Sequence, residues 1–116
     1  ELNTTTVNNG VKTITQTTDE IKNSNVIIFP SSRLWLGIVY LDNNEKRDFF
    51  VESRYDFNTS RDFIAITGHG DFDISVDNNT TTVKNQNPMR FIYSSSNGFE
   101  FISSMRFREL NGGRDW

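Results

Sequence analysis

The sequence contains no cysteine, and this absence excludes disulfide frameworks, thiol catalysis and cysteine-based zinc sites. It contains no apolar run near the roughly 20 residues needed to cross a bilayer, so no membrane insertion is expected. An excess of positive charge is also missing, because the net charge is −3 and the pI is near 5.0. Nucleic acid is therefore not expected as a partner, since its binding depends on a basic face.

Recognisable catalytic motifs are missing as well. The chain has no Gly-X-Ser-X-Gly nucleophile elbow, no His-Glu-X-X-His pair, no glycine-rich phosphate loop and no dinucleotide-binding fingerprint. Its single histidine, His69, lies in the run Gly68-His69-Gly70, which favours a solvated turn residue over a general base or a metal ligand. The sequence therefore predicts a protein that is not an enzyme and that uses no cofactor and no metal.

Aromatic residues compensate for the small number of aliphatic residues in this chain. Hydrophobic residues make up 34% of the sequence, but aromatics account for 13%, and ten residues are phenylalanine. Each large ring removes roughly 150–250 Å² from water when it is buried, so a few rings can supply a core. A length of 116 residues is typical of one ordinary domain.

Period-two alternation of apolar and polar residues predicts strands along most of the chain. The longest alternating segment is 99–108, followed by 49–57 and 72–76, with shorter strands expected over 63–67, 80–83 and 90–93. Turn signals separate these segments: Asp42-Asn43-Asn44, Asn58-Thr59-Ser60, Gly68-His69-Gly70, Asp77-Asn78-Asn79 and Ser96-Asn97-Gly98. We predict an all-β fold, an antiparallel β-sandwich or jelly-roll-like domain, with a small β-barrel as the alternative.

Two segments, 26–29 and 34–41, are apolar on both faces, whereas an antiparallel strand normally shows one face to water. Their second face must be covered by the N-terminal segment or by another subunit, and we favour another subunit. Trp116 follows a Gly-Gly pair, and we expect it to be disordered or docked on a neighbour. The predicted subunit interface consists of Leu34, Trp35, Leu36, Val39, Leu41 and Trp116.

The segment 1–24 differs from the rest because it is polar and rich in Thr and Asn. We interpret it as an N-terminal arm or stem, a strand or extended segment rather than a coiled coil, joined to a β-sandwich domain over 25–116. The chain begins with Glu1 rather than Met, which indicates a processed form or a fragment of a longer protein.

The resulting function hypothesis is a non-enzymatic structural or attachment domain of a virion, as in a phage tail or capsid appendage, or of a cell-surface assembly. Its expected partners are copies of itself in a homo-oligomer, for which a trimer is one candidate, and other structural proteins of the same assembly. One alternative is a small barrel that carries an apolar ligand, because the many phenylalanines could line a cavity.

The other alternative, which ranks ahead of the barrel, is a carbohydrate-binding module or lectin that recognises a surface glycan. Aromatic rings stack on sugar faces, while carboxylates accept hydrogen bonds from hydroxyl groups. Asp71 and Asp73 are two residues apart, which places them on one face of a strand about 7 Å from each other. Calcium favours such oxygens, but a solvated strand face is the simpler interpretation, because the spacing is not that of an EF-hand loop. The candidate ligand-binding residues are Trp35, Tyr40, Asp71, Asp73 and Tyr93.

Overall fold

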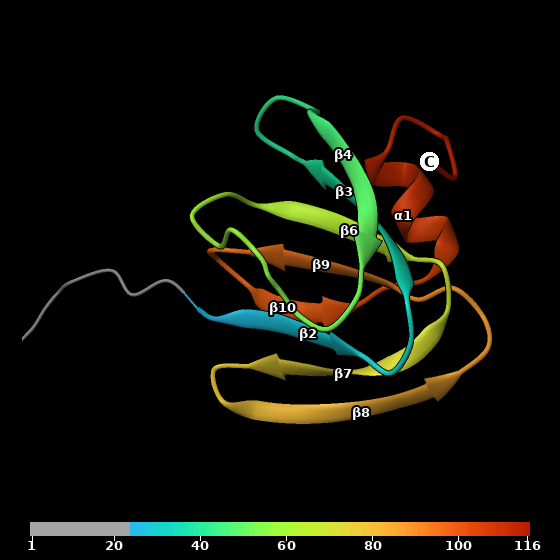
Figure 1. Cartoon of the computed structure of the whole chain (residues 1–116). Coiled ribbons are helices and arrows are strands. Elements are labelled where there is room, and N and C mark those ends of the chain that lie inside the picture. The colour runs from blue at the N-terminus through green and yellow to red at the C-terminus, as the bar shows by residue number, and fades with distance from the viewer. Residues whose placement is uncertain (1–23) are drawn as a thin grey trace, which may run out of the picture.

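The computed structural model describes residues 24–116 as two antiparallel sheets packed face to face, with one short helix near the C-terminus (Figure 1). The sheets are not closed into a barrel. The predicted β-sandwich is therefore confirmed, and the small β-barrel alternative is wrong. The predicted N-terminal arm, residues 1–24, lies outside the described residues except for its last position.

The larger sheet has the strand order β10-β9-β6-β3-β4, and the smaller sheet has the order β5-β2-β7-β8. The strands of the larger sheet are β3 (Leu34–Tyr40), β4 (Lys46–Val51), β6 (Phe63–Thr67), β9 (Arg90–Ser94) and β10 (Gly98–Phe101). The smaller sheet contains β2 (Val26–Pro30), β5 (Tyr55–Asp56), β7 (Gly70–Val76) and β8 (Asn79–Asn85), and helix α1 spans Ser104–Leu110.

The β7–β8 hairpin shows how the local sequence sets the turns. Asp77 and Asn78 have positive φ angles of 52° and 71°, which Asp and Asn tolerate better than most residues. Val76 and Asn79 close the pair on either side, so the reversal takes two residues. This geometry matches the twist of the flanking strands, and the turn predicted at 77–79 is confirmed.

The main core lies between the sheets and is built around aromatic rings, as the composition predicts. The rings of Phe57 and Phe63 stack with centroids 5.0 Å apart and planes 8° apart. Phe91 meets Phe57 edge-on at 5.6 Å. Phe72 lies in the same cluster and is 1% exposed. These rings supply contact area from both sheets in one continuous cluster.

The long strand predicted over 99–108 is only partly correct. The strand β10 ends at Phe101, and Ser103 then caps helix α1 by accepting a hydrogen bond from the main-chain N–H of Arg106 (3.1 Å). The helix buries Phe107 completely and leaves Met105 63% exposed, although both would share one face of a strand. The cap and the burial of Phe107 therefore override the local alternation.

The strand predicted over 49–57 is two strands that belong to different sheets. After β4 the chain crosses between the layers and forms β5, which pairs with β2. Phe49 and Tyr55 still meet across the layers, with ring centroids 4.9 Å apart. The alternation continues across the crossing because both strands direct these rings into the same core.

The second apolar face of β3 is covered by the chain's own C-terminal helix. Val39 on β3 and the pair Ile64 and Ile66 on β6 form a second buried cluster with Phe107 of α1. Figure 1 shows α1 packed beside the larger sheet. The expectation that another subunit covers this face is therefore wrong for the buried part of β3, because Phe107 and the residues around it in 102–116 occupy that position.

Candidate binding site

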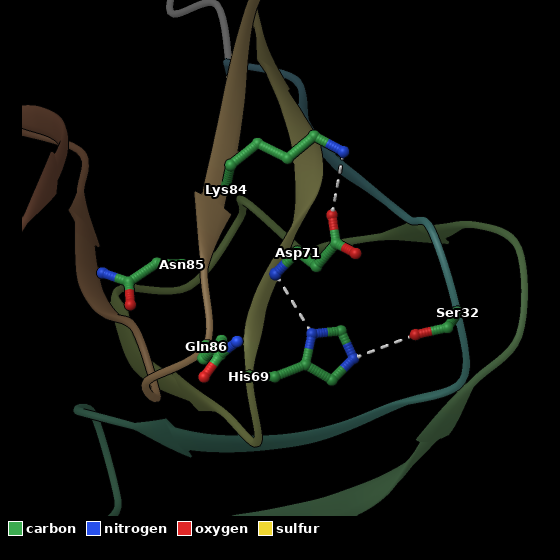
Figure 2. Close-up of a pocket in the computed structure, with 6 residues that line it drawn as sticks. All are labelled: Ser32, His69, Asp71, Lys84, Asn85 and Gln86. Carbon is green, nitrogen blue, oxygen red and sulfur yellow. Dashed lines mark hydrogen bonds and ion pairs between the residues drawn. The ribbon is translucent and has the colours of Figure 1, made fainter.

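A hollow of about 430 Å³ lies at one end of the sandwich, where the β2–β3 loop, the β6–β7 turn and the end of β8 meet (Figure 2). Strand pairing places these segments together, because β7 lies between β2 and β8 in the smaller sheet. The side chains that line the hollow are Ser32, His69, Asp71, Lys84, Asn85 and Gln86. All six are polar or charged, so the hollow is suited to a polar ligand.

The His69 ring is held by contacts on both nitrogens. Its Nδ1 accepts a hydrogen bond from the main-chain N–H of Asp71 (3.0 Å), and its Nε2 lies 3.2 Å from the carbonyl oxygen of Arg33. A ring nitrogen that accepts carries no proton, so the neutral ring has its proton on Nε2 and donates it to Arg33. His69 thereby ties the β2–β3 loop to the start of β7.

This tautomer argues against a Ser–His catalytic pair. The Oγ of Ser32 lies 3.5 Å from Nε2 of His69, at the outer limit of a hydrogen bond. Because Nε2 carries the proton, it cannot take one from the hydroxyl of Ser32. The carboxylate of Asp71 does not orient the ring either, since only its main-chain N–H contacts Nδ1. The arrangement lacks the base that nucleophilic catalysis requires.

Asp71 and Lys84 face one another across β7 and β8 on the outer side of the smaller sheet. The Nζ of Lys84 lies 3.4 Å from Oδ1 of Asp71, an ion-pair distance without the geometry of a hydrogen bond. That oxygen is shielded from solvent and has no hydrogen-bond donor among the described residues. The ammonium group of Lys84 compensates this shielded oxygen in part, while the Asp71 side chain as a whole is 44% exposed, so a ligand hydroxyl would bond to the other carboxylate oxygen.

The amide side chains of Asn85 and Gln86 add donors and acceptors to the hollow. The Oδ1 of Asn85 accepts from the main-chain N–H of Asn87 (2.9 Å), and its Nδ2 contacts only the Sδ of Met89 (3.9 Å). Sulfur is a weak acceptor, so the Asn85 N–H groups keep most of their bonding capacity. Within the described part of the chain, no partner is recorded for the amide of Gln86.

Metal binding finds no support in this region. Over residues 24–116, no three carboxylate or histidine side chains are close enough together to hold an ion. Asp73 lies on the same face of β7 as Asp71 but does not line the hollow. The two predicted aspartates therefore differ in surroundings, and only Asp71 belongs to the site.

The structure does not assemble the five residues that the sequence singled out for ligand binding. Tyr40 and Tyr93 are 5% and 3% exposed and belong to the core between the sheets, so neither can stack on a sugar. Trp35 lies on the outer face of the larger sheet, packed against the α1 side of the molecule. Asp71 alone of the five lines the hollow. Sequence reasoning missed Lys84 and the amides after it, although the polar run Asn85-Gln86-Asn87 ends a strand.

The predicted subunit interface is largely internal. Leu34, Leu36 and Val39 are at most 1% exposed, so they offer no surface to a second subunit, and Leu41 packs against the α1 cluster. Trp116 docks on its own chain rather than on a neighbour. The residues of the set that remain partly exposed are Trp35, Leu41 and Trp116.

Trp116 and Trp35 meet edge-to-face with ring centroids 5.3 Å apart. The slot that holds the Trp116 ring exists because position 37 is glycine: a Cβ at Gly37 would lie 2.7 Å from two ring carbons of Trp116. The Nζ of Lys46 and the Nδ2 of Asn111 both donate to the main-chain oxygen of Trp116. These contacts close the second apolar cluster at its outer end.

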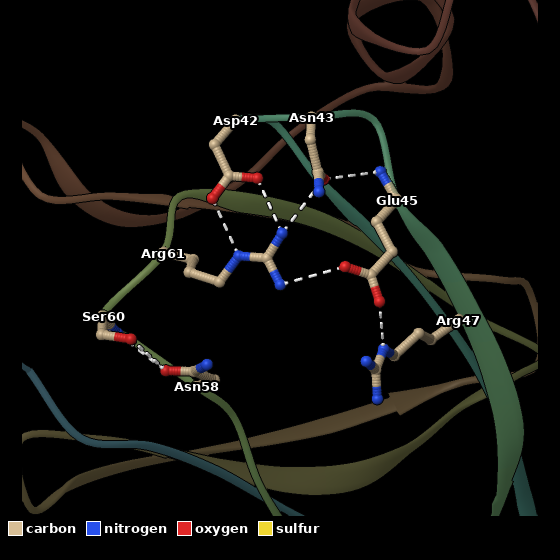
Figure 3. A network of polar contacts seen from close by, with 7 residues as sticks. All are labelled: Asp42, Asn43, Glu45, Arg47, Asn58, Ser60 and Arg61. Atoms are coloured by element: carbon tan, nitrogen blue, oxygen red, sulfur yellow. Dashed lines mark hydrogen bonds and ion pairs between the residues drawn. The ribbon is translucent and has the colours of Figure 1, made fainter.

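A polar network around Arg61 joins the β3–β4 turn to the segment before β6 (Figure 3). The guanidinium of Arg61 donates to both carboxylate oxygens of Asp42 (2.8 and 2.7 Å) and to Glu45 (3.2 Å), and lies 3.8 Å from the ring centroid of Tyr40. Hydrogen bonds from Arg61 lower the pKa of Asp42, and those from Arg47 and Arg61 lower the pKa of Glu45. The network fastens the β3–β4 turn to the segment before β6.

Comparison with protein-family models, curated proteins and solved structures finds no match to this chain. No helix among the described residues is long and apolar enough to cross a membrane.

Proposed function

We propose that this domain is a non-enzymatic attachment module that binds a hydroxyl-rich ligand, such as a surface glycan, in the hollow around His69. The observation on which the proposal rests is the mixture of groups in that hollow. Donors come from Lys84 and the amides, and acceptors come from the carboxylate of Asp71 and the same amides. Sugar hydroxyls both donate and accept, so they match this mixture better than a purely anionic or cationic ligand does.

Two further features favour binding over catalysis. His69 is fixed as a hydrogen-bond donor on Nε2, which leaves Ser32 without a base. The hollow also lies among loops at one end of a rigid sandwich, a common place for recognition sites. The wider hypothesis of a virion or cell-surface assembly fits such a module, because attachment needs selective but non-destructive binding.

The ligand is expected to bind weakly. Among the described residues that line the hollow there is no Phe, Tyr or Trp, so the stacking energy of a large ring is missing and hydrogen bonds must supply most of the affinity. Hydrogen bonds that replace bonds to water contribute about 0.5–1.5 kcal/mol each. A few such bonds correspond to a Kd on the order of 1 mM for a single sugar.

The test is an NMR titration of the full chain with a panel of neutral and acidic monosaccharides and oligosaccharides. A binding sugar is expected to shift the amide resonances of Asp71 and Gln86. The variant Asp71→Asn should weaken that binding roughly tenfold, because the amide replaces a charged acceptor. Asp73→Asn is the matched control, since it makes the same change on the same strand face outside the hollow. The proposal fails if no sugar shifts these resonances, or if both variants bind like the unmodified chain.

A further inference from the structure

Strand β4 presents an open edge of the larger sheet. It is the last strand in the order β10-β9-β6-β3-β4, so among the described residues only β3 pairs with it (Figure 1). Most of its residues are exposed, and Phe50 is 54% exposed. An exposed edge with a large apolar side chain is a template for pairing with another strand.

The direction of the free main-chain groups on β4 follows from its pairing with β3. The N–H of Tyr40 donates to the carbonyl oxygen of Glu45 (2.8 Å), so the carbonyl group of Glu45 faces β3. These groups alternate in direction along an antiparallel strand. The main-chain groups of Lys46, Asp48 and Phe50 therefore point away from β3, toward the open edge.

We propose that β4 pairs antiparallel with β4 of a second copy of this chain, with the two-fold axis at Phe49. In this register Asp48 of each copy lies opposite Phe50 of the other, and Lys46 lies opposite Glu52, the residue that directly follows β4. The outward-pointing residues then face one another, which an antiparallel ladder requires.

The neighbouring registers that keep the ladder bring like charges together. A two-fold axis at Asp48 places this residue opposite its own copy, and an axis at Phe50 places Asp48 opposite Glu52. Like charges directly opposite one another destabilise a strand pair. Larger shifts leave at most three residues of the strand paired. The register centred on Phe49 is thus the one that the charges select.

The existing contacts of these side chains are compatible with the pairing. Glu52 forms an ion pair with Arg33 (3.2 Å), but both side chains are more than 60% exposed and open to a partner. Lys46 donates to the main-chain oxygen of Trp116 and remains exposed. Phe50 lies opposite Trp35 on the outer face. In the dimer the Phe50–Trp35 pairs of the two copies would lie on either side of the interface between the two β4 strands.

The other edge strands are less suited to self-pairing. β8 is polar and has Lys84 as its single charged residue, so a symmetric pair would find no opposite charge. β10 has four residues and β5 has two. Short and polar edges are the usual protection against association. The proposed dimer would carry two copies of the hollow, although it forms independently of any ligand there.

The experiment is sedimentation equilibrium of the full chain from about 10 μM to about 1 mM, the range in which weak, specific dimers dissociate. The unmodified chain is expected to reach a dimer mass. Lys46→Glu and Glu52→Lys should each weaken the homodimer roughly tenfold, because each places two like-charged pairs at the seam. An equimolar mixture of the two variants should dimerise again, since every facing pair is then of opposite charge.

Lys84→Glu makes the same charge change on the edge of β8 and should leave the dimer unchanged. Circular dichroism of each variant verifies that it is folded before its mass is measured. A monomer at every concentration overturns the proposal. So does a mixture that associates no better than its two components, because only this register predicts the rescue. A trimer would overturn it too, since two β4 edges close as a pair.

Discussion

Replacing Gly37 with alanine is expected to expel the Trp116 ring from its slot on the outer face of β3. The added Cβ would lie 2.7 Å from two carbons of that ring and 2.9 Å from Cη2 of Trp35. Such distances are well below the roughly 3.5–4.0 Å of favourable carbon contacts, so the rings must move. The ring of Trp116 cannot simply slide, because Lys46 and Asn111 hold its main-chain oxygen.

The size of the effect follows from two opposing terms. Overpacking of this kind costs about 1–3 kcal/mol. Alanine in place of glycine within a strand recovers about 0.5–1 kcal/mol. We therefore expect Gly37→Ala to lower the free energy of unfolding by about 1–2 kcal/mol, within the usual range for an overpacked site.

A double-mutant cycle isolates the contact. In a Trp116→Ala background the nearest remaining atom to the new Cβ is Cη2 of Trp35 at 2.9 Å, and that ring is free to tilt into the emptied space. Gly37→Ala should then cost less than about 0.5 kcal/mol, which gives a coupling energy of about 1 kcal/mol or more. Urea unfolding followed by circular dichroism measures all four proteins without relying on tryptophan fluorescence. Equal costs in the two backgrounds would refute the reasoning.

Three further substitutions test other parts of the fold. Ser103→Ala should lower the free energy of unfolding, measured in urea, by about 1 kcal/mol, because α1 loses its N-cap. Ser104→Ala is the control, and it should change the free energy of unfolding by less than about 0.5 kcal/mol. Asn78→Ala should cost about 1–2 kcal/mol in the same assay, because this residue has a φ of 71°, and an unchanged midpoint would contradict that. The hydrogen bonds from Arg61 lower the pKa of Asp42 below its ordinary 3.8. The Arg61–Asp42 ion pair therefore stabilises the folded chain fully above that pH, and this stabilisation is lost as the pH falls through the lowered pKa. Arg61→Leu should therefore flatten the fall in melting temperature between about pH 5 and pH 2, and an unaltered pH profile would argue against this role.

The candidate site shows the limits of prediction from local pattern. The sequence places His69 in a turn and Asp71 on a strand face, and both placements agree with the structure. It gives no signal that Ser32 and Gln86, more than fifty positions apart, meet beside them. That meeting depends on β7 pairing with both β2 and β8, and the strand pattern does not record which strands are neighbours.

The all-β class, most strand positions and the tight turns could be predicted from the sequence alone. These features depend on side-chain alternation and on backbone angles of Asn, Asp and Gly, which act over a few residues. Three features depend on contacts between distant parts of the chain: residues 49–57 cross between the sheets, residues 104–110 form a helix, and this helix covers β3. The helix and its position depend on burying Phe107 against Val39, which is remote in the chain, and the crossing depends on burying Val51 and Phe57 in the core between the sheets. Long-range burial is worth more than the local preference it overrides, so no local pattern could reveal it.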